Sequence, residues 1–184
     1  IIYVDIASNS IQDAGAAEII SALQTNKSVI SIKMGSNSGV SRNTIGQNAA
    51  KQMALLLKNN KVLTDIDLTM AEITSDSMRT IATGLKANHT LQNLSIGNNN
   101  IGSRGCRKLL HSCMQSQIVT LNLANNHIKD DVGPDFAKYL TNNRCLRSLN
   151  LSGNDLTKGF IKAISVPFSN SAMLTDLNLS HNPI

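Results

Sequence analysis

The sequence predicts an α/β solenoid, a right-handed coil of strand–helix units with a parallel sheet on its concave face and helices on its convex face. Three observations predict this fold class. A segment of 11 residues with fixed aliphatic positions recurs along the chain. The stretch after each segment changes to helical periodicity. The composition, with 41% hydrophobic, 3% aromatic and 16% charged residues, is typical of a folded chain with an aliphatic core.

The recurring segments predict the strands. They start at residues 1, 29, 63, 91, 118, 146 and 174. Each has aliphatic or methionine side chains at its first, fourth and sixth positions, with mostly polar residues at the third and fifth. This period-two pattern is typical of a half-buried strand, so we expect seven parallel strands near these starts.

The ninth position of the segment is asparagine in six of the seven units. An asparagine side chain both donates and accepts, so it can satisfy backbone groups where the chain turns out of a strand. Ala71 replaces it in the third unit, where we expect a looser turn or a substitute partner. The expected ladder of structural asparagines is Asn9, Asn37, Asn99, Asn126, Asn154 and Asn182.

The stretches between the segments predict helices that cover the sheet. In residues 12–26, Ala16, Ile19, Ile20 and Leu23 lie on one helical face. Neither a strand nor a helix of this kind buries its apolar face alone, so stacked units must bury them against each other. Strands stack about 4.8 Å apart and helices about 10 Å apart, so the stack should curve with the strands inside.

With this pattern in hand, the chain resembles a known family. The segments match LxxLxLxxNxL, and the 28-residue unit with small residues near the helix start (Gly15, Gly105) is similar to leucine-rich repeats of the ribonuclease-inhibitor-like subfamily. The resemblance covers essentially the whole chain. It implies a horseshoe fragment over residues 1–184, one domain of about six to seven repeats, and a protein-binding role. Because neither terminal repeat has a polar cap, we expect a fragment of a longer protein.

The second unit is six residues too long, and the excess falls within residues 38–48. Its glycine, serine and asparagine content is typical of a loop. Two interpretations stay open, a surface insertion without function and a recognition loop on the rim of the sheet. For the second interpretation the residues are Ser41, Arg42 and Asn43.

No arrangement of side chains predicts catalysis, a metal site or a cofactor. Cys106 and Cys113 lie about 10.5 Å apart along a helix, too far for a disulfide, and share an apolar stripe with Leu109 and Leu110. We therefore expect core cysteines and a protein that is not an enzyme. Unbridged cysteines favour a reducing compartment, the cytoplasm of the producing cell or, for a secreted effector, of a host cell. No apolar run approaches the roughly 20 residues that span a bilayer, so no membrane insertion is expected.

The charge pattern argues against nucleic acid as a partner. The net charge is +5, but the expected inner face carries four acids (Asp5, Asp65, Asp67, Asp176) and only two bases (Lys33, Arg147). The basic excess therefore lies on helices and loops. A nucleic-acid reader needs a continuous basic face with stacking groups.

We expect a protein partner of unspecified identity to bind the concave face and its rim, centred on Lys33, Asp67, Met70 and Arg147. The strand columns form a rigid lattice, so binding orders few side chains. The insertion and the missing asparagine lie in the second and third units, and departures from a regular pattern tend to occur at functional sites. Two alternatives stay open, a small-GTPase regulator resembling the Ran GTPase-activating protein and a tropomodulin-like cytoskeletal binder. The expected contact residues are Tyr3, Asp5, Lys33, Asp65, Asp67, Met70, Asn122, Arg147, Asn150 and Asp176.

Overall fold

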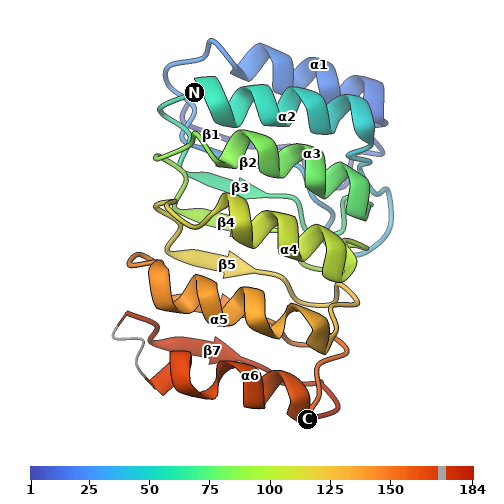
Figure 1. Cartoon of the computed structure of the whole chain (residues 1–184). Coiled ribbons are helices and arrows are strands. Elements are labelled where there is room, and N and C mark those ends of the chain that lie inside the picture. Colours follow the sequence, from blue (N-terminus) through green and yellow to red (C-terminus); the bar gives the residue numbers. More distant parts are fainter. Residues whose placement is uncertain (170–172) are drawn as a thin grey trace.

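The computed structural model describes residues 1–169 and 173–184, and it shows a stack of strand–helix units (Figure 1). Seven parallel strands form one sheet in sequence order, so the strand prediction is confirmed. The strands are β1 (Tyr3–Asp5), β2 (Ser31–Lys33), β3 (Asp65–Asp67), β4 (Asn93–Ser95), β5 (Thr120–Asn122), β6 (Ser148–Asn150) and β7 (Asp176–Asn178).

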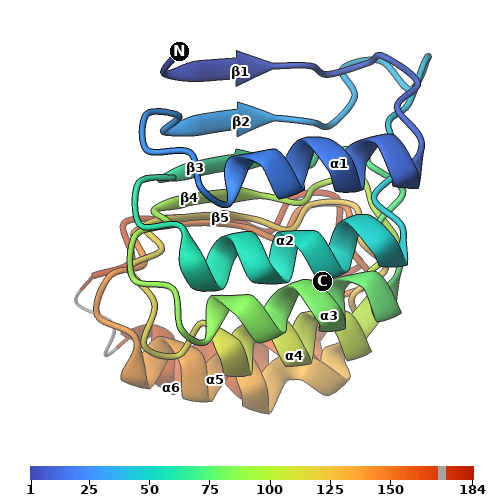
Figure 2. The same cartoon turned by 90° about the horizontal axis from the view of Figure 1, so that it is seen from above.

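The helices form a second layer on one side of this sheet, as Figure 2 shows. Each helix of the described residues follows a strand, and the helices of neighbouring units pack side by side. The helices are α1 (Asp13–Leu23), α2 (Gln47–Asn59), α3 (Ser75–Leu85), α4 (Gly102–Ser112), α5 (Gly133–Asn142) and α6 (Lys158–Ser169), with a short 3-10 turn, η1 (Asp130–Val132), before α5.

The repeats are in register, which places equivalent positions in columns across the sheet. Ile32 pairs with Ile66, and Ile66 pairs with Leu94, so the fourth position of each unit faces its counterpart in the next. On β2–β6 these central residues are at most 3% exposed and point into the core between the two layers. The third and fifth positions consequently point to the other face of the sheet.

The asparagine ladder is confirmed at its centre. Asn99, Asn126 and Asn154 are buried. The Asn99 amide donates to the carbonyls of Leu68 and Ile96 at 2.9 Å, which ties two successive repeats together. Asn182 makes equivalent bonds, whereas Asn9 is exposed and reaches only its own repeat at Ala7, because no described repeat stacks before it.

The assignment of Asn37 to the ladder is wrong, and so is that of Asn43 to the recognition loop. Asn37 is exposed, and its place is taken by Asn43, which is 0% exposed. The Asn43 side chain donates to Ile6 and Met34 and accepts from the Ile11 backbone N–H. The physical reason is that the six extra residues lie between the strand and the ladder position, so a count from the strand stops too early.

Ala71 has a substitute for the missing side chain, as the sequence analysis allowed. At Asn99, for example, the side-chain oxygen accepts from the backbone N–H groups of Ala71 and Ile73 in the preceding repeat. Here the N–H of Asn43 donates to the Ser36 hydroxyl at 3.1 Å, and the N–H of Ile45 donates to the Ala71 carbonyl at 2.9 Å. Both backbone N–H groups therefore have an acceptor, although the buried Ala71 has no side-chain oxygen.

A second set of asparagines, which the sequence analysis did not assign, caps the helix-to-strand connections. Asn60, Asn88 and Asn143 are buried, and each accepts from two backbone N–H groups of the following turn. Each stands three residues before the leucine that opens the next segment. That fixed spacing was the available sequence signal.

Candidate functional site

The face of the sheet turned away from the helices is a polar lattice. The Asn93 amide donates to the Asp65 carboxylate at 2.6 Å, and the Asn122 amide donates to the Ser95 hydroxyl at 3.0 Å. The hydroxyls of Thr69 and Ser95 are 2.9 Å apart. These bonds between neighbouring strands hold short side chains in fixed positions, which lowers the entropy lost when a partner binds.

Lys33 and Asp67 border two adjacent hollows on this face. The inner hollow has a volume of about 310 Å³, and the rim hollow about 210 Å³. The Lys33 amine lies 3.9 Å from the Asp5 carboxylate, and both side chains are more than half exposed. The inner hollow is lined by Ser31, Ile32, Lys33, Asp65, Ile66, Asp67, Asn93, Leu94, Ser95, Thr120 and Asn122, and the rim hollow by Ala7, Lys33, Gly35, Ser36, Asn37, Asp67, Thr69, Met70 and Asn98.

Met70 is the irregular member of the rim. It has a φ of 55°, in the left-handed region that suits glycine or asparagine. The neighbouring repeats place Asn98, Asn125 and Gly153 in the same conformation at this position. A bulky apolar side chain held in an unfavourable backbone conformation at a solvent-facing hollow marks a candidate contact. The thioether is also adaptable to different partner surfaces.

The expected contact residues form two groups and one separate residue. Tyr3, Asp5, Lys33, Asp65, Asp67 and Met70 lie together on β1–β3 and the turn after β3. Asn122, Asn150 and Asp176 lie on β5–β7, where Asn150 accepts from Ser152 and Asp176 accepts from Ser148. Arg147 belongs to neither group. Of the rim loop, Ser41 and Arg42 are exposed, and Ser41 accepts a bond from the Ser10 backbone.

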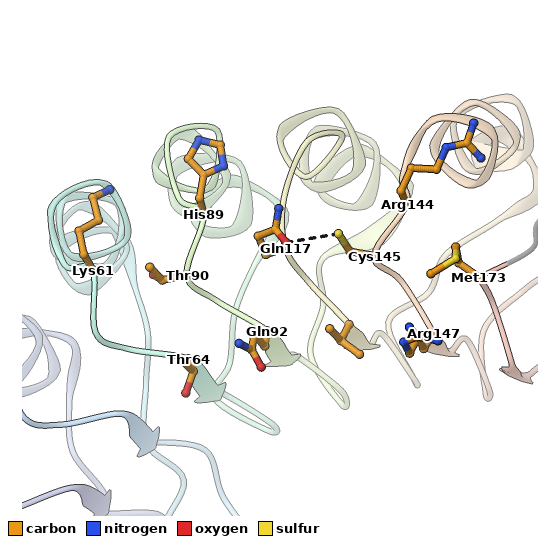
Figure 3. Close-up of a pocket in the computed structure, with 11 residues that line it drawn as sticks. Lys61, Thr64, His89, Thr90, Gln92, Gln117, Arg144, Cys145, Arg147 and Met173 are labelled. Atoms are coloured by element: carbon orange, nitrogen blue, oxygen red, sulfur yellow. Dashed lines mark hydrogen bonds between the residues drawn. The ribbon is translucent and has the colours of Figure 1, made fainter.

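The placement of Arg147 beside Lys33, Asp67 and Met70 is wrong. Arg147 stands immediately before β6, at the edge where the chain enters the sheet, whereas Met70 follows β3 at the opposite edge. Arg147 lines a separate hollow of about 560 Å³ that we call the strand-start groove (Figure 3). Its lining residues are Lys61, Thr64, His89, Thr90, Gln92, Gln117, Val119, Arg144, Cys145, Arg147 and Met173.

Sequence reasoning missed the basic residues of this groove. Lys61, His89 and Arg144 each stand two residues before the first residue of a segment, so the repeat alignment puts them in one column. The inner face expected from the sequence comprised only positions within the 11-residue segments. An alignment of the repeats that includes the second residue before each segment shows this basic cluster.

Cys106 on α4 and Cys113 directly after α4 are core residues, as predicted. Cys106 and Cys113 are 0% exposed. Burial raises the pKa of the Cys106 thiol and raises the pKa of the Cys113 thiol to about 12, which keeps both protonated and unreactive at neutral pH. Among the described residues no group of three or more His, Cys, Asp or Glu side chains is arranged to hold a metal ion. Over the same residues, no helix has the length and apolarity to cross a membrane.

Comparison with known families agrees with the geometry. A family model described as Leucine Rich repeat matches residues 87–110, 142–164 and 170–184. The chain contains leucine-rich repeats. In this chain the central residues of β2–β6 are buried, as are the ladder asparagines Asn99, Asn126 and Asn154.

Two curated relatives share this repeat region. The chain is 30% identical over 137 residues to the rat protein "NACHT, LRR and PYD domains-containing protein 3", which aligns with 69% of this chain. It is also 30% identical over 129 residues to the mouse protein "NACHT, LRR and PYD domains-containing protein 14", with 68% of this chain aligned. The leucine-rich repeats of this chain span 13% of the length of either relative.

Among solved structures, one described as "Leiomodin-1 Actin-Binding Site 2 (ABS2)" has a similar fold. The TM-score is 0.64, and the match covers 85% of this chain and 87% of that one. The sequence identity is 18%. The likeness therefore shows a shared leucine-rich repeat fold.

Proposed function

We propose that this leucine-rich repeat region is a scaffold, without catalytic activity, that binds a protein partner on its concave face around Lys33, Asp67 and Met70. The observation that carries the proposal is that Lys33 and Asp67 border both the inner and the rim hollow. A partner element seated there contacts opposite charges and an apolar side chain together. Combined charge and apolar contact is typical of specific interfaces.

The size of the face suits a macromolecular partner. Seven strands span six gaps, so the sheet is about 29 Å long at about 4.8 Å per gap. This length seats a helix or one side of a small domain. The hydrogen-bonded lattice of Asp65, Asn93, Ser95 and Asn122 gives that partner a preformed surface.

In this proposal the other expected contact residues extend the binding surface around Lys33, Asp67 and Met70. Tyr3 and Asp5 extend the surface beyond Lys33, and Ser41 and Arg42 border the rim on the same side. Asn122, Asn150 and Asp176 extend it along β5–β7. Hot spots are few in most interfaces, so we place the largest effects at Lys33, Asp67 and Met70.

Site-specific photo-cross-linking tests this proposal. A photo-reactive amino acid is introduced at Ser95, which lines the inner hollow, and at Thr83, which is exposed on α3 as a matched control. Each variant is irradiated in cell lysate, and the cross-linked proteins are identified. We expect a defined adduct from Ser95 that the Lys33→Glu, Asp67→Lys double variant loses. A defined adduct from Thr83 alone would overturn the assignment of the concave face.

We also propose that the repeats are of the ribonuclease-inhibitor-like type. A helix of 10 to 13 residues follows each of the strands β1–β6, which is the feature that suggested this subfamily. The three free cysteines support the cytoplasm, of the producing cell or of a host cell, as the place of action.

A cytoskeletal role is the second candidate function. It follows from the fold shared with the domain described as a leiomodin-1 actin-binding site. One fold serves many functions, so the comparison by itself gives no contact residues. Co-sedimentation with filamentous actin and binding to monomeric actin test this candidate directly. Binding that is lost in the Lys33→Glu, Asp67→Lys variant would identify actin as the concave-face partner.

A further inference from the structure

We propose that the strand-start groove is a second binding site, and that it takes an acidic peptide segment of a protein partner. The groove lies at the edge of the sheet opposite to Met70 and has a volume of about 560 Å³. It is built from the helix-to-strand connections of successive repeats. This inference does not depend on the concave-face proposal, because the groove shares no lining residue with the inner or the rim hollow.

The charge of the groove is one-sided. Lys61, Arg144 and Arg147 are exposed, and His89 stands between the first two in the row of connections (Figure 3). No carboxylate occurs among the described residues that line the groove. The three permanent cations also form no ion pair with a described residue, unlike Lys33, which lies 3.9 Å from Asp5. The groove therefore carries positive charge that a ligand can neutralise.

The cations are arranged in a row. Figure 3 shows Lys61 and Arg144 at opposite ends, on connections that belong to different repeats, with Arg147 at the level of the strands. Three repeat spacings separate Lys61 from Arg144, which is about 14 Å at strand spacing and about 30 Å at helix spacing. An extended peptide covers this range with about five to nine residues. A single compact anion cannot contact both ends.

The groove also offers fixed hydrogen-bond donors. The Lys61 amine donates to the carbonyls of Lys58 at 2.9 Å and Ala87 at 3.3 Å, which holds the side chain in place with one N–H left. The Gln117 side-chain oxygen accepts from the Cys145 thiol at 3.4 Å, which orients its amide nitrogen as a donor. Carboxylates accept such bonds from both lysine and amide groups.

The lining favours a peptide over a nucleic acid. Single-stranded nucleic acids bind by stacking their bases on aromatic rings between basic residues. The described residues of the groove include no Phe, Tyr or Trp. Val119 and Met173 instead supply aliphatic contacts that suit the side chains between spaced carboxylates.

Fluorescence anisotropy with defined probes tests the proposal. The probes are labelled peptides of about eight residues, one of alternating glutamate and leucine, and one with glutamine in place of every glutamate. Inorganic phosphate and a single-stranded oligonucleotide serve as competitors. The main variant is Lys61→Glu, Arg144→Glu, Arg147→Glu. The matched control is Lys51→Glu, Lys108→Glu, Lys138→Glu, which changes the net charge equally on exposed helix positions.

We expect the acidic peptide to bind the wild-type chain, with at least tenfold loss in the main variant and less than twofold change in the control. A second variant, Arg144→Gln with Arg147→Gln, leaves Lys61 and its backbone bonds intact and should lose at least threefold. Thermal melts check that every variant is folded. Equal loss in the control, equal binding of the glutamine peptide, displacement by millimolar phosphate, or tighter oligonucleotide binding through the same residues would each overturn the proposal.

Discussion

The side-chain amide of Asn43 donates to the backbone carbonyl of Ile6 at 2.9 Å, across 37 positions of the sequence. The same amide donates to the Met34 carbonyl at 2.9 Å, so one side chain joins the first two repeats. Asn43 thereby restores the regular ladder after a six-residue insertion.

Replacement of Asn43 should destabilise the chain far more than replacement of Asn37. In Asn43→Ala, buried carbonyls and N–H groups lose their partners, which should cost about 1–3 kcal/mol. Asn126→Ala should cost a similar amount for the same reason. Asn37→Ala, at an exposed site, should change the free energy of unfolding by less than about 0.5 kcal/mol. Urea unfolding measures all three, and equal costs at residues 37 and 43 would contradict the assignment.

The Ser36 hydroxyl should be structural because it replaces a ladder oxygen. It accepts from the N–H of Asn43, and Ser36 is 4% exposed. Ser36→Ala leaves that N–H without a partner and should cost about 1–3 kcal/mol. Ser38→Ala, on the exposed loop, is the matched control and should be close to neutral. Thermal unfolding compares the two, and a neutral Ser36→Ala would show that another group takes the bond.

The backbone conformation of Met70 predicts that its replacement by asparagine raises stability and weakens partner binding. Asparagine tolerates the left-handed region better than methionine, so Met70→Asn should stabilise the chain by about 0.5–1 kcal/mol. The reciprocal change Asn98→Met, at the same repeat position, should destabilise it by a similar amount. Calorimetric melting measures both. If Met70 contacts the partner, Met70→Asn should also weaken partner binding at least threefold.

Stability should fall at alkaline pH because of the core cysteines. Burial raises the pKa of Cys113 from 9.0 to about 12 in the folded chain. Above pH 9 the unfolded chain loses this proton while the folded chain keeps it, so the free energy of unfolding falls as pH rises from about 9 towards 12. Urea unfolding under reducing conditions at about pH 8 and about pH 10.5 measures the fall. The slope should be smaller in Cys113→Ala, and an unchanged slope would assign the effect to other groups.

Charge reversal on the concave face should weaken binding of the cross-linked partner, once it is identified. Lys33→Glu and Asp67→Lys change groups that border both hollows, and each should raise the dissociation constant at least fivefold. Lys51→Glu and Lys108→Glu, at exposed helix positions, are the matched controls and should have less than twofold effects. Larger effects at the helix positions would place the binding face on the convex side.

The sequence by itself determined the strands, the helices and most of the ladder. Periods of two and of 3.6 residues are local properties of the sequence. The burial of Ile66 and Leu94 can therefore be predicted from the polar residues on either side of each. Cys106 and Cys113 were assigned to the core from the same helical spacing, and the structure buries both. The columns of the inner face could also be predicted, because stacked repeats place equivalent positions side by side across the sheet.

Only the tertiary structure decided which asparagine enters the ladder after the insertion, and which charges lie together. Asn37 fits the local pattern as well as any ladder residue, but only Asn43 reaches the Ile6 carbonyl of the preceding repeat. Arg147 was grouped with Lys33 as a base of the inner face, although it lines the strand-start groove together with Arg144 and Lys61. Both outcomes depend on contacts between repeats, where residues far apart in sequence satisfy each other's backbone groups or share one surface.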